Sequence, residues 1–385
     1  MPTPTSFDVT ILGGGLAGRL CGWQLVQAGV SPARIAVVER GARDGSSAAA
    51  YVAAAMLAPL AEAAVADRFV VDLGLVSLAL WRDWLPKLRT PVFFQEAGTL
   101  VVWHAADRGE ASLFASRVRA IAPPERVAAD LRAVDAAGIG TLEPLLAQRF
   151  TQGLYLAGEG QLDPRTLLHA LATELEALGV QLRWNTEVAD PSPDALAANG
   201  LGARLVLDCR GLGAKPQWPR LRGLRGEVAR IHAPDVSLTR PVRMLHPRYP
   251  IYIAPKPGNV YVIGATEIES DDMSPASVRS TLELLSAAYA VHPAFGEARV
   301  LELNTQCRPT LPDHRPAFRW DKGGKELGTL SVNGLYRHGY MIAPAVTQAA
   351  VAIARDLLDG RATNAQDREW PELFAATASP EPVLS

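Results

Sequence analysis

A glycine-rich turn between two apolar segments constrains the fold of this chain more than any other feature. Gly13, Gly15 and Gly18 have the spacing G-x-G-x-x-G, in which the first glycine allows a tight turn and the second lets a pyrophosphate approach the backbone. The third glycine allows the following helix to pack closely on the strand. Residues 8–12 have the composition of a strand and residues 16–28 that of a helix. The sequence therefore predicts a strand–turn–helix unit that binds a dinucleotide.

A second apolar segment completes this unit and ends in an acid. Residues 35–38 are strand-like, and Glu39 follows them about 20 residues beyond the turn, where a carboxylate accepts hydrogen bonds from a ribose 2′-OH. The free N–H groups and partial positive charge of the helix N-terminus suit the phosphates. We expect Leu16, Ala17 and Arg40 to contact the cofactor beside the turn and the acid.

Composition excludes several classes of partner. The chain has 385 residues, 48% of them hydrophobic, with a net charge of −2, which predicts no nucleic-acid partner and no attraction to an anionic membrane. Cys21, Cys209 and Cys307 lie far apart, and the histidines show no paired ligand spacing, so we expect neither a disulfide framework nor a metal site. The alanine-rich residues 46–66 are too short to cross a bilayer, and the N-terminus lacks a secretory pattern. We expect a cytoplasmic protein without membrane insertion.

Helix and strand patterns alternate at the start, middle and end of the chain, with extended, hairpin-rich sequence between them. This predicts an α/β (α+β two-domain) fold in which a Rossmann-like domain is interleaved with an antiparallel-sheet substrate domain. The predicted ranges are 1–85, 155–220 and 305–385 for the cofactor domain, and 86–154 and 221–304 for the substrate domain. Asp163 and Pro164 are predicted to begin a helix that runs to Gly179, and Pro257-Gly258-Asn259 is predicted to join two strands in a β-hairpin. Pro344 is predicted to begin the last helix.

The number of glycine turns indicates which dinucleotide binds. The sequence contains no second G-x-G-x-x-G, so a separate nicotinamide site is not indicated. Two later segments, residues 208–213 and 331–339, again combine a strand with glycines and are expected to join the same nucleotide-binding unit. A long cofactor such as FAD needs this additional binding surface. We therefore expect FAD.

Four segments carry motifs of one protein family. Residues 46–59 contain Ser-Ser-Ala-Ala-Ala and then Ala-Ala-Ala-Met-Leu-Ala-Pro, and residues 252–256 read Tyr-Ile-Ala-Pro-Lys. Arg308-Pro309 precedes Leu-Pro-Asp, and residues 336–344 read Tyr-Arg-His-Gly-Tyr-Met-Ile-Ala-Pro. In these motifs, which span nearly the whole chain, the sequence resembles the D-amino acid oxidase family, most closely the glycine oxidases of thiamine biosynthesis.

The resemblance implies a set of flavin contacts. It assigns this role to Ser46, Ser47, Ala48, Ala54, Met56, Val188, Gly211, Arg337, His338, Gly339, Tyr340, Met341 and Ile342. The covalent members of the family use a cysteine, and none of the three cysteines lies in a matching segment. The resemblance therefore implies non-covalent FAD.

Three residues are candidates for catalysis. The guanidinium of Arg308 can form two parallel bonds to a substrate carboxylate, and the following proline favours extended backbone. The Tyr252 hydroxyl completes this site, and Arg337 belongs to a loop that the family uses as a lid over the flavin. The alternatives are a structural salt bridge for Arg308, a plain sheet residue for Tyr252 and a surface arginine for Arg337.

The expected reaction is oxidative deamination of glycine, sarcosine or small D-amino acids, with hydride passing from Cα to flavin N5 and O2 reduced to H2O2. Supply of iminoglycine for the thiamine thiazole is implied by the resemblance alone. Glu267 matches a family position near the substrate side chain, where an acid would repel a second carboxylate, so we expect poor activity on D-Asp and D-Glu. Two alternatives remain, a dehydrogenase that passes electrons to a quinone or carrier and a non-catalytic flavoprotein. A homo-oligomer is compatible with the sequence.

Overall fold

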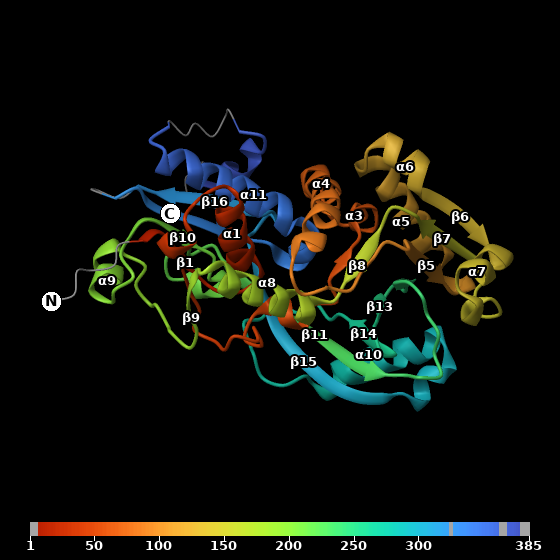
Figure 1. Ribbon diagram of the computed structural model, residues 1–385. Helices are drawn as coiled ribbons and strands as arrows, with labels where there is room; N and C mark the ends of the chain where they lie inside the picture. Colours follow the sequence, from red (N-terminus) through yellow and green to blue (C-terminus); the bar gives the residue numbers. More distant parts are fainter. Residues whose placement is uncertain (1–6, 323–325, 362–367, 378–385) are drawn as a thin grey trace, which may run out of the picture.

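A six-stranded sheet holds the glycine turn. The computed structural model describes residues 7–322, 326–361 and 368–377. The sheet has the order β16-β17-β10-β1-β2-β9, and its strands are β1 (Phe7–Leu12), β2 (Ile35–Val38), β9 (Gln181–Arg183), β10 (Ala203–Asp208), β16 (Ala317–Asp321) and β17 (Gly328–Asn333). All neighbours pair in parallel except β16, which is antiparallel to β17. This is the predicted Rossmann-like sheet, built from segments far apart in the sequence (Figure 1).

Four helices form the main core around this sheet. They are α1 (Leu16–Gln27), α4 (Arg68–Trp84), α8 (Pro164–Leu178) and α11 (Gly339–Leu358). The α8 ends follow the predicted signals, because the Asp163 side chain accepts from the Thr166 N–H and Gly179 ends the helix with φ of 89°. Within the described ranges, α11 is the one helix long and apolar enough to cross a membrane, and most of it is buried against the rest of the protein.

The prediction that Pro344 begins the last helix is wrong, because α11 already starts at Gly339. A proline inside a helix leaves the carbonyl four residues earlier without its N–H partner. Here that carbonyl belongs to Tyr340, and the indole Nε1 of Trp81 donates to it at 2.8 Å. A side chain from α4 thus supplies the missing donor, and the helix N-terminus lies five residues closer to the predicted lid.

An eight-stranded, mostly antiparallel sheet forms the second part of the molecule. Its order is β15-β11-β14-β13-β12-β5-β7-β6, with β5 (Thr99–Trp103), β6 (Leu131–Asp135), β7 (Gln152–Leu156), β11 (Arg222–His232), β12 (Val242–Leu245), β13 (Ile251–Lys256), β14 (Val260–Gly264) and β15 (Arg299–Thr310). The predicted hairpin joins β13 to β14, where Gly258 and Asn259 have φ of 75° and 57°. Helix α10 (Val278–Val291) packs on this sheet. The predicted domain boundary at residue 305 lies within β15, and the division into domains stays a prediction.

The alanine-rich segment is not one helix. It forms α2 (Ala49–Val52), β3 (Met56–Leu57) and α3 (Pro59–Glu62), and Ala55 has φ of 51°. Strand β3 joins β8 (Gly160–Leu162) and β4 (Phe94–Gln95) in a small sheet. The remaining helices are α5 (Arg108–Ile121), α6 (Pro124–Asp130), α7 (Ala136–Leu142) and α9 (Pro193–Ala198).

Candidate functional site

One long cavity connects the glycine turn to the large sheet. Its volume is about 1130 Å³, and it extends from Gly13 and Gly15 to Tyr252 and Arg308. All the predicted site residues line it except Gly18, Ser46 and Ile342. Gly18 packs behind the turn, Ser46 is exposed and donates to Asp44, and Ile342 is fully buried in the core.

The glycine turn has the geometry that a dinucleotide requires. Gly13 has φ of 95°, and a Cβ on it would lie 2.6 Å from the carbonyl oxygen of Cys209. A Cβ on Gly18 would overlap the carbonyl oxygen of Gly13. Gly15 is the N-cap of α1, and no side chain caps the helix there, so its first N–H groups are free for phosphate oxygens. Glu39 accepts from the N–H groups of Gly14 and Gly41 at 2.6 and 2.7 Å, which places its carboxylate beside the turn.

A buried arginine that the sequence analysis missed supports this turn. Arg19, on α1, is fully buried and donates to the carbonyl oxygens of Gly14, Leu168 and Arg43 at 2.6, 2.5 and 2.9 Å. Burial lowers the pKa of Arg19 from its ordinary value to about 10. Its guanidinium lies 4.9 Å from the ring of Trp184. Arg19 therefore connects three parts of the chain, namely the glycine turn, helix α8 and the segment that follows β2.

These features fit FAD. The uncapped helix N-terminus and the adjacent Glu39 suit the pyrophosphate and the ribose, and the cavity continues from them past Ala54 and Met56 to the predicted catalytic residues. Gly339 and Met341, at the N-terminus of α11, line the same cavity. Among the residues that the structure describes, no cluster of His, Cys, Asp or Glu side chains suits a metal ion.

Arg308 and Tyr252 project from β15 and β13 into the far end of the cavity. Gly226 and Gly264 leave room for them, because a Cβ at either position would collide with the Arg308 guanidinium or the Tyr252 hydroxyl. Arg308 donates to the Thr266 carbonyl at 3.3 and 3.4 Å, and it pairs with no carboxylate in the described part of the chain. Burial raises the pKa of Tyr252, while the positive charge of Arg308 acts against this rise. The two side chains therefore offer a cation and a neutral hydroxyl donor.

Glu62, at the end of α3, is the centre of a charged cluster. Its carboxylate lies 3.1 Å from Arg243, 3.1 Å from Arg337 Nε and 3.2 Å from His338 Nδ1. Burial opposes its ionisation, but Arg337, His338 and Arg243 together hold the pKa of Glu62 well below its ordinary value. Burial lowers the pKa of His338, so its imidazole is neutral at pH 7.

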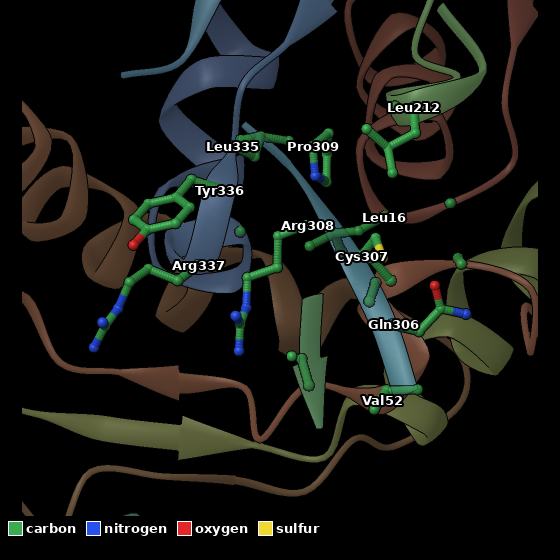
Figure 2. Close-up of a pocket in the computed structure, with 18 of the residues that line it drawn as sticks. Leu16, Val52, Leu212, Gln306, Cys307, Arg308, Pro309, Leu335, Tyr336 and Arg337 are labelled. Carbon is green, nitrogen blue, oxygen red and sulfur yellow. The ribbon is translucent and has the colours of Figure 1, made fainter. Parts of the chain in front are cut away.

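Arg337 does not lie free over the cavity, because it is held between two carboxylates. Its Nη1 donates to Glu267 at 3.1 Å and its Nη2 to Glu62 at 3.2 Å. Glu267 also accepts from the Tyr336 hydroxyl. The two carboxylates raise the pKa of Arg337 although burial acts the other way. Figure 2 shows Arg337 and Arg308 extending side by side into the cavity.

Sequence reasoning missed Glu62, Arg243 and Arg19. A detectable signal existed for two of them, since Glu62 is an acid in an apolar alanine-rich run and Arg19 a cation in an apolar helix. A charged residue is almost never fully buried unless it has partners, so either residue indicates a specific polar contact.

Comparisons with known proteins agree with this geometry. The model of the FAD dependent oxidoreductase family matches residues 8–353. The chain is 40% identical over 350 residues to ThiO of Rhizobium etli, an oxidoreductase assigned by name to thiamine biosynthesis, covering 91% of this chain and 96% of the relative. It is 27% identical over 355 residues to the glycine oxidase of Geobacillus kaustophilus, covering 88% of this chain and 90% of the relative. The crystal structure of glycine oxidase from Geobacillus kaustophilus has the same fold, with a TM-score of 0.78, 23% identity and coverage of 96% and 98%.

Proposed function

Because this chain belongs to the family of FAD-dependent oxidoreductases, we propose that it is an amino-acid oxidase that deaminates glycine and other small amines bearing one carboxylate. The observation that carries this proposal is Arg308, a cation in the cavity that pairs with no described carboxylate and lies beside the hydroxyl of Tyr252. The overall reaction converts glycine, O2 and water to glyoxylate, ammonia and H2O2.

The chain acts mainly by binding and orienting the substrate. Arg308 binds the carboxylate through two charge-assisted bonds, and the Tyr252 hydroxyl donates a further one. With the carboxylate fixed, rotation of a small amino acid is restricted and its Cα–H keeps one orientation. FAD, when bound, supplies the acceptor for the hydride that leaves Cα.

Two further groups complete the site. Neutral His338 is held by Glu62 and is not required as a base, because the amine reacts in its neutral form. The N-terminus of α11 at Gly339 borders the cavity, and its dipole favours negative charge there.

The test is an anaerobic screen of the holoprotein for flavin reduction with glycine, sarcosine, and paired D- and L-alanine and proline. We expect bleaching of the flavin by glycine and sarcosine, and H2O2 formation after air is admitted. If the flavin is reduced without formation of H2O2, but the enzyme turns over with an artificial electron acceptor, the protein is a dehydrogenase and not an oxidase. An unchanged flavin spectrum across the panel would contradict catalysis altogether and support a non-catalytic flavoprotein.

We further propose that the protein supplies iminoglycine to thiamine biosynthesis in the cytoplasm, and the name of the Rhizobium etli relative supports the link to that pathway. A thiamine requirement of a deletion strain, relieved by the wild-type gene, tests this role. Sedimentation of the holoprotein measures whether it forms a homo-oligomer. Acid precipitation tests the expectation that FAD is non-covalent, in which case all of the flavin should remain in the supernatant.

A further inference from the structure

The charges around Tyr252 leave room for one substrate carboxylate. Arg243, Arg308 and Arg337 are the cations that act on its hydroxyl, and Glu62 acts on it as an anion. Glu267 supplies a second carboxylate through its ion pair with Arg337. Arg243 and Arg337 each pair with a carboxylate, whereas Arg308 has no carboxylate partner among the described residues. The one carboxylate of a small amino acid would therefore give the third cation its partner.

Arg337 is the second cation that a substrate could reach, and each of its three nitrogens already lies beside a carboxylate. Glu62 is 3.1 Å from Nε and accepts from Nη2 at 3.2 Å, and Glu267 accepts from Nη1 at 3.1 Å. The Glu62 side chain is 12% exposed, whereas that of Glu267 is 43% exposed. Glu267 is therefore the more exposed of the two carboxylates on Arg337, and it lines the cavity together with this arginine.

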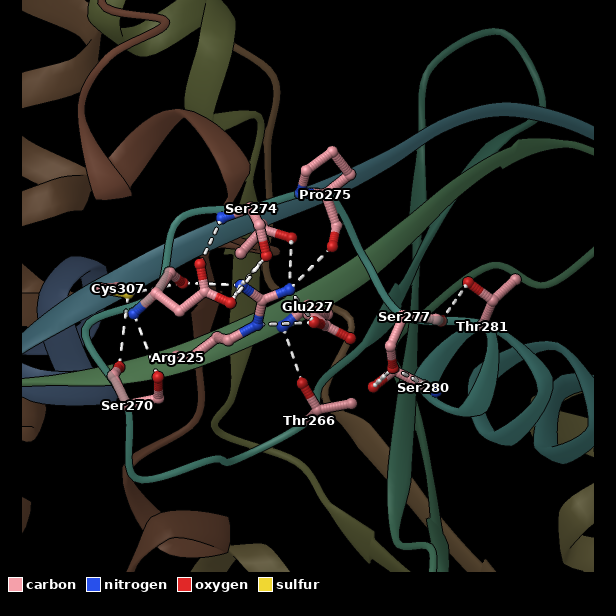
Figure 3. Close-up of polar contacts among 12 residues, drawn as sticks. Arg225, Glu227, Thr266, Ser270, Ser274, Pro275, Ser277, Ser280, Thr281 and Cys307 are labelled. Atoms are coloured by element: carbon pink, nitrogen blue, oxygen red, sulfur yellow. Dashed lines mark hydrogen bonds and ion pairs between the residues drawn. The ribbon is translucent and has the colours of Figure 1, made fainter.

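The backbone holds Glu267 firmly in this position. The N–H of Thr266 donates to the Glu227 carbonyl, and the N–H of Ile268 donates to the Arg225 carbonyl, so both neighbours of Glu267 are fixed to β11. Arg225 is buried, pairs with Glu227 and donates to the carbonyl of Pro275 at 2.9 Å (Figure 3). The segment that carries Glu267 is thus attached to the sheet before and after it.

We propose that Glu267 blocks a latent second carboxylate site on Arg337 and thereby restricts the enzyme to amines with one carboxylate. This inference rests on the proposed function and gives its substrate class. A second carboxylate would meet Glu267 instead of a free guanidinium and would add an uncompensated negative charge to the cavity.

Glu267→Gln tests this inference, because glutamine keeps the size and an acceptor for Tyr336 while removing the charge. The probes are succinate and succinamate, which have the same shape but carry two carboxylates and one. Their dissociation constants for the holoprotein are measured from flavin absorbance at pH 8 and fixed ionic strength. We expect succinamate to bind wild type more tightly, and E267Q to improve succinate relative to succinamate by at least about tenfold.

Glu269→Gln is the matched control, because Glu269 also pairs with an arginine, at 3.0 Å from Arg222, but is 64% exposed and does not line the cavity. We expect it to change the ratio by less than about twofold. Equal binding of both probes to wild type, an unchanged ratio in E267Q, or the same shift in E269Q would overturn the inference. The titration needs no turnover, so a protein that fails to oxidise glycine but shows the shift contradicts the proposed function alone.

Discussion

Replacement of Arg308 by methionine is expected to remove substrate binding while leaving the fold intact. Among the residues that the structure describes, its guanidinium makes only long hydrogen bonds, of 3.3 and 3.4 Å, to the Thr266 carbonyl. Methionine is similar in length and apolar, so we expect the free energy of unfolding to change by less than about 1 kcal/mol. With substrate bound, the variant lacks two charge-assisted bonds of about 1.5–3 kcal/mol each. Their sum, about 3–6 kcal/mol, predicts a loss in kcat/KM of about 10²- to 10⁴-fold.

The assay is H2O2 release with glycine, combined with a spectral titration of the flavin with succinamate and a thermal unfolding curve. Arg308→Lys keeps the charge but not the planar fork, so we expect an intermediate loss of about 10- to 10²-fold. Arg279→Met, at an exposed arginine elsewhere along the cavity, is the matched control, with an expected change below about threefold. An R308M enzyme within about threefold of wild type at unchanged thermal stability would refute the carboxylate role.

Three further predictions concern the cofactor turn and a buried acid. Gly18→Ala should weaken FAD binding at least about tenfold, because the new Cβ would overlap the Gly13 carbonyl oxygen. Gly109→Ala is the control and should leave FAD binding unchanged, because its Cβ would meet nothing within 4 Å. Equal FAD dissociation constants in the two variants would contradict this reasoning. Arg19→Met should lower apoprotein stability by about 2–4 kcal/mol in urea unfolding and weaken FAD binding, since three carbonyl groups lose the hydrogen bonds that Arg19 donates, two of them buried. An unchanged unfolding midpoint would show that the buried charge brings no net gain in stability. Burial raises the pKa of Glu159 from 4.5 to about 7, so its stabilising protonated form is present below pH 4.5 and lost as pH rises through 7. Glu159→Gln should therefore gain about 3 kcal/mol over wild type in unfolding free energy between pH 4.5 and 8, and parallel pH profiles would disprove the assignment.

The elements that local chemistry determines could be predicted from the sequence. The glycine turn, the α8 caps and the β13–β14 turn depend on residues within a few positions of each other, and all three are confirmed. The exception among local signals is Pro344, because the donor that replaces its missing N–H comes from Trp81, far away in the sequence.

The charge state of the candidate site could not be predicted in the same way. Arg337 is recognisable as a site residue from its motif, but its partner Glu62 is 275 residues away. Nothing in the spacing of either residue indicates that the other neutralises it, since the contact depends on how the fold brings α3 next to the segment before α11. The prediction that Glu267 disfavours dicarboxylates gains a different physical basis, because its charge is paired with Arg337 rather than free.

The assembly of one sheet from distant segments has a consequence for the order of biosynthesis. Gln24, behind the glycine turn, donates to Thr347 of α11, and these residues are 323 positions apart. At common elongation rates, about 16 to 65 s separate their synthesis. During this interval the nascent chain has its phosphate-binding turn but lacks α11, which closes the cavity. We therefore expect FAD to bind after synthesis of the chain, so growth conditions that limit flavin should increase the amount of full-length apoprotein rather than of truncated chains.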